Sequence, residues 1–395
     1  MITLINTLLS IAAILLLIPV SVLWVQVVAA MPRARAACPP PTPRPTIAIL
    51  IPAHNEGAGL HDTLASLKPQ LIHGDRLLVV ADNCTDNTME FASHAGAEVI
   101  QRHDMQRRGK GYALDFGMRH LAQHPPELVI IVDADCIVDA GAVDYLARLS
   151  MWRMRPVQAL YLMLAPNDAG LKTRIAEFAW RVRNHLRPLG FYRMGLPCQL
   201  MGSGMAFPWS LISTVEMASG EIVEDMKLGI DLACCGHAPL FCPQVRVTSV
   251  FPNNAEGTQS QRTRWEHGHL SMIAHAAPRL LGRAVGKLDV QLLALTLDMS
   301  VPPLALLTLL TFFMWVLTTL FYLFTGVMGA WWWSSLVLSL LFFAVMLAWL
   351  RAGRDIVPFG KLLLFVSYIF WKIPIYFKIL GKRQIEWVRS KRDSE

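Results

Sequence analysis

Charged residues are scarce in this 395-residue chain, and its two ends have almost none. Only 16% of the residues are charged while 54% are hydrophobic, a balance that excludes a purely soluble enzyme. Residues 1–32 carry no charged side chain, and from residue 288 to residue 350 the only formal charges are Asp289 and Asp298. The sequence therefore predicts a membrane protein with a soluble domain between two apolar ends.

Several familiar motifs are also absent. There is no GxGxxG and no GxxxxGK[ST], so neither a Rossmann dinucleotide site nor a P-loop is supported. No zinc finger or other nucleic-acid motif appears, and basic residues beside membrane spans explain the net charge of +7, so we expect no nucleic-acid partner. Seven cysteines without a CxxC pair predict reduced, mostly structural thiols rather than a metal cluster or a disulfide framework.

The apolar ends predict three membrane spans. Residues 1–32 are long enough for a transmembrane helix, and the alternative, a cleaved secretory signal, lacks a basic residue before its apolar run. Arg33 and Arg35 follow this helix, so the positive-inside rule places the next domain in the cytoplasm. Residues of about 302–326 and 331–350 form a hairpin of two further spans that returns to the basic side.

The last apolar segment, residues 358–380, is interrupted by Lys372, Pro374 and Lys378 and precedes a basic tail. It fits an interfacial or re-entrant helix, whereas a fourth crossing would place the basic tail outside, against the charge rule. We expect a C-terminal membrane domain over residues 281–395, beginning with an interfacial helix. A proline-rich linker, residues 33–45, separates the first span from a soluble domain over residues 46–280.

The soluble domain alternates short apolar runs with helical patterns, which predicts an α/β fold with a mostly parallel sheet. Ligands bind at the carboxyl ends of the strands in such sheets. The expected strands are residues 46–52, 76–82, 97–100, 127–135 and 157–164, and helices are expected within residues 57–67, 86–95 and 111–122.

Four polar clusters follow the first four strands, at residues 52–56, 82–86, 107–111 and 133–135. Since residues two apart in an extended segment point the same way, Asp133 and Asp135 are expected to face one pocket. Two such carboxylates would suit a Mg²⁺ ion bridging to a diphosphate, although a solvated turn is the alternative.

The other clusters offer polar groups for the same ligand. Glu56 and Asp82 suit hydrogen bonds to a nucleoside, and helix N-caps are their alternative role. Lys110 lies between two glycines, so its ammonium could approach a ligand closely; a solvated loop lysine is the alternative.

Two motifs further along the chain add candidate catalytic groups. Glu224 and Asp225 begin a predicted helix, where Asp225 would act as a general base, or where both would only complement the helix dipole. Gln261, Arg264 and Trp265 share one face of another helix, and the arginine could bind diphosphate oxygens.

These motifs resemble those of the family 2 glycosyltransferases, in that family's order, across residues 46 to about 275. The resemblance is to the membrane-integrated branch that includes bacterial exopolysaccharide glycosyltransferases, ceramide glucosyltransferases, and hyaluronan and cellulose synthases. It implies a GT-A fold, a nucleotide-sugar donor that is usually UDP-linked, and Mg²⁺ or Mn²⁺. The stretches that carry it are "IPAHNE", "DNCTDNT", "RGKG", "DADC", "GSGMAF", "VEDMKLG" and "QRTRW".

The resemblance also implies roles for individual residues. It gives Asp135, with Asp133 beside it, to the metal, and it makes Asp225 the catalytic base, with Glu224 and Arg264 as further catalytic groups. The nucleotide sugar would contact Pro52, Asn55, Glu56, Asp82, Lys110, Asp133, Gly202, Ser203, Gly204, Gln261, Arg264 and Trp265.

The expected activity is inverting transfer of a hexose, with UDP-glucose or a similar donor as the first choice. Three firm spans favour a single addition to a lipid-linked acceptor at the cytoplasmic face of a bacterial inner membrane. The acceptor would be a polyprenyl-diphosphate saccharide in exopolysaccharide or cell-envelope glycan assembly, or a glycolipid. The alternatives are transfer to a ceramide-like or hopanoid lipid, a processive polysaccharide synthase, and a non-catalytic subunit that binds nucleotide sugar.

Overall fold

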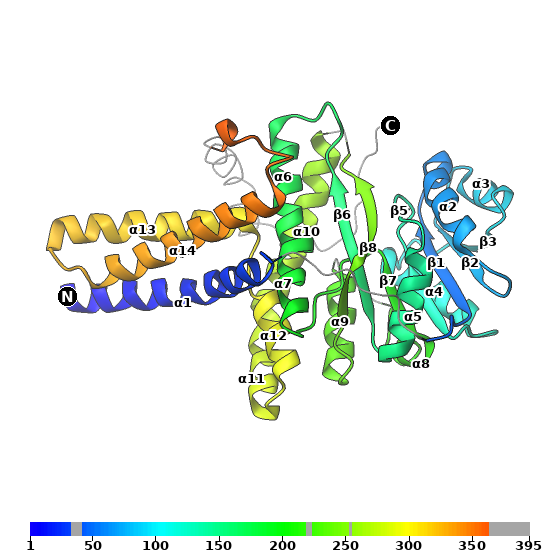
Figure 1. The fold of residues 1–395 in the computed structure, drawn as a ribbon, viewed down its shortest axis with the longest axis horizontal. Helices are drawn as coiled ribbons and strands as arrows, with labels where there is room; N and C mark the ends of the chain where they lie inside the picture. The colour runs from blue at the N-terminus through cyan, green and yellow to red at the C-terminus, as the bar shows by residue number, and fades with distance from the viewer. Residues whose placement is uncertain (33–41, 219–222, 253–254, 363–395) are drawn as a thin grey trace. The chain divides into compact units, whose positions relative to one another are not determined.

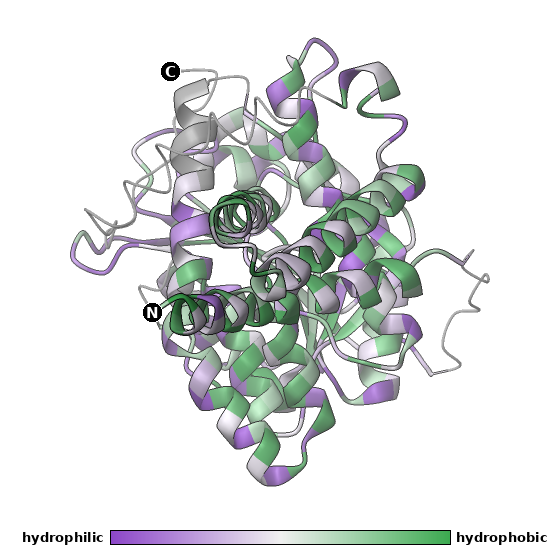
Figure 2. Cartoon of the chain, turned by 90° about the vertical axis from the view of Figure 1, so that its left-hand side faces the viewer, coloured by the Kyte–Doolittle hydropathy of each residue, from purple (hydrophilic) through white to green (hydrophobic). Residues whose placement is uncertain are grey.

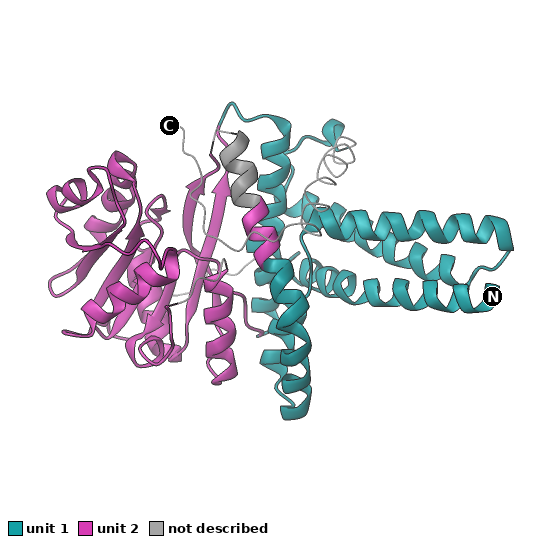
Figure 3. Cartoon of the chain, turned by 180° about the vertical axis from the view of Figure 1, so that it is seen from behind, with its two compact units in different colours: residues 1–33, 167–195, 269–384 teal, residues 34–166, 196–268, 385–395 magenta. Residues whose placement is uncertain are grey.

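The computed structural model describes residues 1–32, 42–218, 223–252 and 255–362, with the backbone alone for residues 255–262. These residues belong to two compact units, coloured in Figure 3. Unit 1 comprises residues 1–33, 167–195 and 269–384, and unit 2 comprises residues 34–166, 196–268 and 385–395. Most of the predicted interfacial segment 358–380 lies outside the described residues, and the expected domain boundaries stay predictions.

Unit 2 is built on an eight-stranded sheet in the order β3-β2-β1-β4-β7-β6-β8-β5 (Figure 1). Four strand pairs are parallel, and the pairs β4/β7, β6/β7 and β5/β8 are antiparallel. The sheet is therefore mixed, with parallel pairs in the majority, in agreement with the predicted mostly parallel sheet. Its strands are β1 Ile47–Ala53, β2 Arg76–Asp82, β3 Glu98–Arg102, β4 Leu128–Ile131, β5 Ile137–Val138, β6 Val157–Leu164, β7 Met205–Pro208 and β8 Leu240–Val250.

The predicted strand over residues 127–135 is shorter than expected. Strand β4 ends at Ile131, and a turn follows in which the Cys136 N–H donates to the Asp133 carbonyl over 3.2 Å. Asp133 and Asp135 are therefore neighbours across a turn, and the prediction of an extended segment through both residues was wrong.

Helices α4 and α9 lie on one face of the sheet and share a core with it. Leu114 of α4 and Leu228 of α9 belong to one buried cluster with Val129 of β4 and Phe207 of β7. Since both helices pack on the same face, the start of α4 and the start of α9 come to the same pocket. The helices of unit 2 are η1 Gly57–Leu60, α2 His61–Leu67, η2 Lys68–Gln70, α3 Thr88–His94, α4 Lys110–Leu121, α5 Ala142–Arg153, α8 Trp209–Ile212 and α9 Glu224–Cys234.

Unit 1 is helical, and three of its helices, α1, α13 and α14, are long and apolar enough to cross a membrane. Figure 2 looks along these helices and shows their hydrophobic residues. Their bounds are close to those predicted. Helix α10, Ala255–His275, contributes residues to both units, and unit 1 contains α1 Ile2–Ala29, α6 Leu171–Arg181, η3 Val182–Leu186, α7 Arg187–Arg193, α11 Ala277–Lys287, α12 Val290–Met299, α13 Leu304–Thr325, α14 Gly329–Ala352 and η4 Phe359–Lys361.

A buried polar network holds α1, α7 and α12 together inside unit 1. Arg187 of α7 donates to the Asp298 carboxylate of α12 over 2.8 Å, and the Gln26 amide of α1 donates to the same oxygen over 2.7 Å. A Cβ at Gly190 would lie 2.0 Å from the Gln26 carbonyl oxygen, so α7 and α1 are in close backbone contact. Asp298, one of the two charged residues between residues 288 and 350, is thus paired inside the protein.

Candidate functional site

The loops after β1 and β2 are tied together by hydrogen bonds. Asn55 follows β1 with a left-handed backbone, φ 53°, and its side-chain oxygen accepts from the Thr85 N–H over 2.7 Å. The Glu56 N–H donates to the Thr88 hydroxyl over 2.8 Å. Pro52 lies within β1 itself. The polar clusters at residues 52–56 and 82–86 are therefore joined at one edge of the sheet, where the sequence predicted a nucleoside site.

Asp82 ends β2 and forms a buried ion pair with Arg102, which ends β3. Their closest nitrogen and oxygen lie 2.6 Å apart, and the parallel register places the two residues opposite one another. Arg102 also donates to the Arg107 carbonyl over 2.7 Å, so it holds the loop that leads to Lys110. The helix-cap alternative for Asp82 was wrong, since Asn87 is the N-cap of α3.

Sequence reasoning missed Arg102. The pattern that could have found it is a pair of opposite charges at the carboxyl ends of consecutive strands, Asp82 and Arg102. Residues at the carboxyl ends of two neighbouring parallel strands lie side by side when the two strands end at the same level of the sheet.

Lys110 begins α4 and connects three other parts of the site. Its ammonium lies 2.5 Å from an Asp133 oxygen, donates to the Gly202 carbonyl over 2.7 Å, and lies 4.0 Å from a Glu224 oxygen. Burial lowers the pKa of Lys110, but attraction to Asp133 and Glu224 outweighs burial and holds this pKa above its ordinary value. The solvated-loop alternative for Lys110 was wrong.

The loop before β7 adopts backbone conformations that favour glycine. Gly202 has φ 95°, and Gly204 has φ 69°. A Cβ at Gly204 would lie 2.7 Å from the Val247 side chain, so this position is closed to larger residues. The Ser203 hydroxyl accepts from the Asp133 N–H over 3.1 Å, which joins this loop to the turn after β4.

The turn after β4 offers a set of ligand atoms for a divalent cation. Atoms of Asp133, Asp135 and Cys136 lie within 4.8 Å of one another. Burial raises the pKa of the Cys136 thiol well above its ordinary value, so the sulfur stays protonated and the carboxylate oxygens are the available donors. Lys110 already neutralises Asp133, whereas Asp135 is exposed. The oxygen donors fit Mg²⁺ or Mn²⁺, with Asp135 as the more accessible ligand.

Glu224 and Asp225 occupy the first turn of α9, as predicted. One Asp225 oxygen accepts from the Met226 N–H over 2.8 Å, and the other would lie 3.4 Å from a Cβ placed at Gly202. Burial raises the pKa of Glu224 to about 7, with Lys110 opposing the shift and Asp225 adding to it. Asp225 thus presents one oxygen to the space above Gly202.

The structure describes only some side chains of the "QRTRW" motif. Gln261, Arg264 and Trp265 all lie on α10, as predicted, but the Gln261 side chain is outside the described residues. Burial lowers the pKa of Arg264, and the negative charge of Glu224 opposes this shift. Arg264 is therefore close enough to Glu224 to interact electrostatically.

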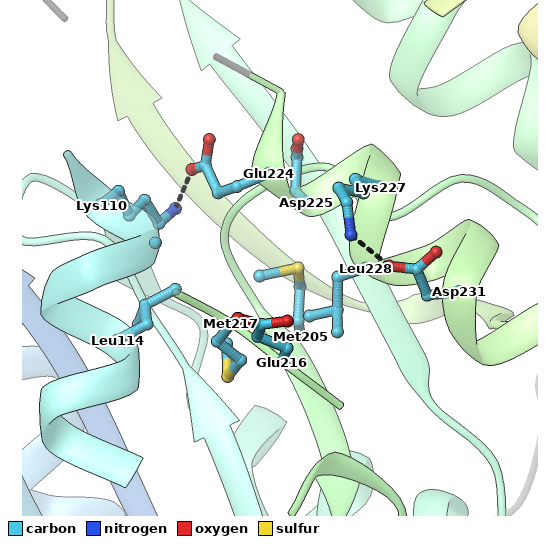
Figure 4. A pocket seen from close by; sticks show the side chains of 11 residues that line it. Lys110, Leu114, Met205, Glu216, Met217, Glu224, Asp225, Lys227, Leu228 and Asp231 are labelled. Atoms are coloured by element: carbon cyan, nitrogen blue, oxygen red, sulfur yellow. Dashed lines mark hydrogen bonds and ion pairs between the residues drawn. The ribbon is translucent and has the colours of Figure 1, made fainter. Parts of the chain in front are cut away.

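A pocket opens between the start of α4 and the start of α9 (Figure 4). The empty space within the pocket and at its open mouth is about 380 Å³. In Figure 4 Lys110 lies on one side of the pocket and the Lys227–Asp231 ion pair on the other, with Glu224 and Asp225 between them. Glu216 also lines the pocket. The rest of its lining is Gly111, Leu114, Met205, Met217 and Leu228.

Comparison with known families gives a direct match. The family model described as "Glycosyltransferase like family 2" matches residues 43–268, which is more than half of the chain. The chain belongs to this family. The matched residues include every candidate site residue named above.

Curated relatives of this family 2 chain are also named as glycosyltransferases. The probable glycosyltransferase YdaM of Bacillus subtilis is 27% identical over 256 residues, which cover 58% of this chain and 56% of the relative. An uncharacterized glycosyltransferase of Mycobacterium tuberculosis is 33% identical over 147 residues, which cover 35% of this chain and 62% of the relative. The chain thus spans between half and two thirds of the length of these relatives.

A solved structure shares the fold. The mannosyltransferase PcManGT from Pyrobaculum calidifontis, solved in complex with GDP-Man and Mn²⁺, has a TM-score of 0.53 to this chain. The match covers 94% of this chain and 95% of that one at 16% sequence identity. The family 2 chain therefore has the GT-A fold that the sequence predicted, and the same chain contains helices that could cross a membrane.

Proposed function

We propose that this chain is an inverting, metal-dependent glycosyltransferase that moves a sugar from a UDP-linked donor to a lipid-linked acceptor. The observation that carries the proposal is the convergence of three side chains above Gly202. A Cβ built on this glycine would lie 3.4 Å from Asp225, 3.6 Å from the Lys110 ammonium and 3.8 Å from Asp133. A base, a cation and an acidic group for the donor thus surround one point that carries no side chain.

The reaction would be a single displacement. The acceptor hydroxyl gives its proton to the Asp225 oxygen that faces Gly202, while the hydroxyl oxygen forms a bond to the anomeric carbon. The bond between that carbon and the diphosphate breaks on the opposite side, and the nucleoside diphosphate leaves. One displacement inverts the anomeric configuration.

The leaving diphosphate requires positive charge. Arg264 lies near Glu224 at the same end of α9, and a guanidinium can donate to two phosphate oxygens at once. Bound Mg²⁺ or Mn²⁺, held by Asp135 with Asp133 beside it, would supply further charge stabilisation. Lys110 pairs with Asp133 and so offsets the repulsion between the carboxylates of Asp133 and Asp135.

The donor base and ribose would bind at the edge formed by the loops after β1 and β2. Glu56 and Asp82 can accept from base N–H groups and ribose hydroxyls. Arg102 acts as a positioning residue there, because it fixes Asp82 and the loop before Lys110. PcManGT was solved with GDP-Man and Mn²⁺, which supports a nucleotide-sugar donor and a divalent cation for this chain.

The acceptor is proposed from the membrane helices. Three helices of suitable length and hydropathy belong to the same chain as the GT-A domain. We propose that they anchor the enzyme in a bacterial inner membrane with its catalytic domain in the cytoplasm. Three spans among the described residues leave little material for a polymer channel, which favours one addition to a polyprenyl-diphosphate saccharide or another glycolipid in cell-envelope glycan assembly.

The role of Asp225 can be tested with Asp225→Asn in the purified full chain. Loss of a general base typically lowers the rate about 10²- to 10⁴-fold. We expect that loss in UDP release with an acceptor present, and donor affinity by calorimetry close to that of the wild type. Asp115→Asn, in the middle of α4 and outside the pocket lining, is the matched control and should retain activity. Substantial turnover by Asp225→Asn contradicts the assignment.

The donor and acceptor can be tested in one screen. UDP-glucose, UDP-galactose, UDP-N-acetylglucosamine and GDP-mannose are each incubated with the enzyme and a membrane lipid extract. A single sugar added to a prenyl-linked saccharide supports the proposal. Transfer to a ceramide-like or hopanoid lipid changes the acceptor, a long polymer overturns the single addition, and binding without any release overturns the enzyme itself.

A further inference from the structure

Helix α11, Ala277–Lys287, carries an exposed apolar stripe that has no place in the proposed reaction. Leu281 and Val285, one turn apart, are 41% and 58% exposed. The stripe continues past the end of the helix, where Leu288 is 87% exposed and Val290 is 64% exposed. Large apolar side chains in a row on a surface indicate a contact with another apolar phase.

The same helix carries a basic stripe. Arg279, Arg283 and Lys287 are spaced four residues apart, which places them along one side of the helix, and all three are exposed. The sequence of α11 contains no aspartate or glutamate. We call these three residues and the four apolar residues together the α11 surface.

The packing of α11 leaves both stripes outward. Ala277 and Ala284 are buried on the remaining side of the helix, and α11 packs against α12 within unit 1. Asp289 joins the two helices, and its carboxylate accepts from the Leu292 N–H at the start of α12. The two helices therefore form a small hairpin whose outer side is the α11 surface.

The direction of this hairpin is informative because α1, α13 and α14 belong to the same unit. Figures 1 and 3 show α11 and α12 running across the direction of these three long helices. In Figure 2, which looks along the long helices, α11 extends towards the bottom of the view and carries both hydrophobic and hydrophilic residues. If the long helices cross a bilayer, α11 runs parallel to its plane.

We propose that the α11 surface lies in the membrane interface and binds the headgroups of anionic lipids. The apolar stripe would enter the boundary between headgroups and acyl chains, and the basic stripe would attract phosphate groups. Helices with this division of side chains bind membranes in this manner. The inference rests on the membrane placement proposed above and is independent of the transfer reaction.

The first test measures lipid binding by the full chain. The protein is reconstituted in nanodiscs of phosphatidylcholine mixed with phosphatidylglycerol, and the lipids retained on it are counted by native mass spectrometry. Each basic side chain near a membrane surface strengthens binding to anionic lipid about fivefold. The double variant Arg279→Gln, Arg283→Gln should therefore retain phosphatidylglycerol about 25-fold less strongly.

A matched double variant separates local binding from net charge. Arg119→Gln, Arg153→Gln removes two exposed arginines from unit 2 and should leave phosphatidylglycerol retention unchanged. Equal losses in the two double variants overturn the proposal, as does equal retention by the wild type and the α11 variant. Neither measurement depends on sugar transfer, so failure here is distinct from failure of the proposed function.

The second test identifies what covers the apolar stripe. A photo-crosslinking p-benzoylphenylalanine at Val285 should form an adduct with phospholipid in the nanodisc, whereas the same residue at Ile72, which is 57% exposed in unit 2, should not. A crosslink from position 285 to residues 363–395 of the same chain, or to a second copy, would show a protein occupant and overturn the proposal.

Discussion

Replacing Lys110 by methionine should destabilise the soluble unit and do so more strongly at high pH. The ammonium contacts Asp133, the Gly202 carbonyl and, at longer range, Glu224. Methionine keeps most of the side-chain volume and removes the charge, so two carboxyl groups lose a cation. The side chains of Lys110 and Asp133 are 20% and 26% exposed, which gives solvent some access to the pair.

The size of the effect follows from this burial. Breaking a fully buried ion pair costs about 3–5 kcal/mol, and an exposed pair is worth about 0–1 kcal/mol. We expect a loss of about 2 kcal/mol for Lys110→Met, which lowers Tm by roughly 4–8 °C for a domain of this size. Lys227→Met is the matched control, since its ion pair with Asp231 is 40% exposed on both sides and should cost only about 0.5 kcal/mol.

The pH dependence has a definite sign. Burial already raises the pKa of Asp133 and brings that of Glu224 to about 7, and Lys110 opposes both shifts. Without Lys110 both pKa values rise further. An acid whose pKa is raised in the folded state loses stability as pH rises, so the penalty for Lys110→Met should be smaller near about pH 5 than near about pH 8.

The assay is thermal unfolding of the purified full chain at the two pH values and one scan rate. A fall in Tm that is the same for Lys110→Met and Lys227→Met would refute the reasoning. So would a penalty that does not change with pH.

Three further changes have defined outcomes. Asp135→Ala should abolish the strengthening of UDP binding by Mg²⁺ in calorimetry, and an unchanged difference with and without metal contradicts its role as a ligand. Burial raises the pKa of Glu224 to about 7, so the wild type should lose thermal stability between about pH 4.5 and pH 7. Glu224→Gln should remove this loss. If the Tm of the wild type and of the variant changes with pH in the same way, Glu224 does not titrate in this range. Arg102→Met leaves Asp82 buried without its ion pair, so the free energy of unfolding should fall by about 3–5 kcal/mol. The Arg119 side chain is 75% exposed, so Arg119→Met should change this free energy little.

Local patterns predicted the regular elements well. Strands β2 and β6 have the predicted bounds, residues 76–82 and 157–164, because each is a mostly apolar run that is almost wholly buried. The long apolar helices were equally evident, since about 20 apolar residues suffice to cross a bilayer. In these segments the side chains alone carry enough burial energy to select the element.

Patterns that depend on a distant partner were not predictable. Strand β7, Met205–Pro208, is four residues long and pairs antiparallel with β4 and β6. Its register depends on two strands that lie tens of residues away in the sequence. Its own four residues show no alternation of polar and apolar side chains that could indicate a strand or its partners. The same holds for Arg102, whose importance follows from a parallel pairing with β2.

The amino-acid sequence by itself determined the family, the position of the apolar helices and the residue types of the site, because ordered motifs and hydropathy are properties of the chain. Only the tertiary structure decided which residues each of the acidic side chains Asp133, Asp135 and Asp225 contacts. The turn after β4 directs Asp133 to Lys110 and leaves Asp135 exposed, while the common core of α4 and α9 brings Asp225 to Gly202. The chemistry of each carboxylate depends on the charge and burial around it, and both are set by packing between residues far apart in the chain.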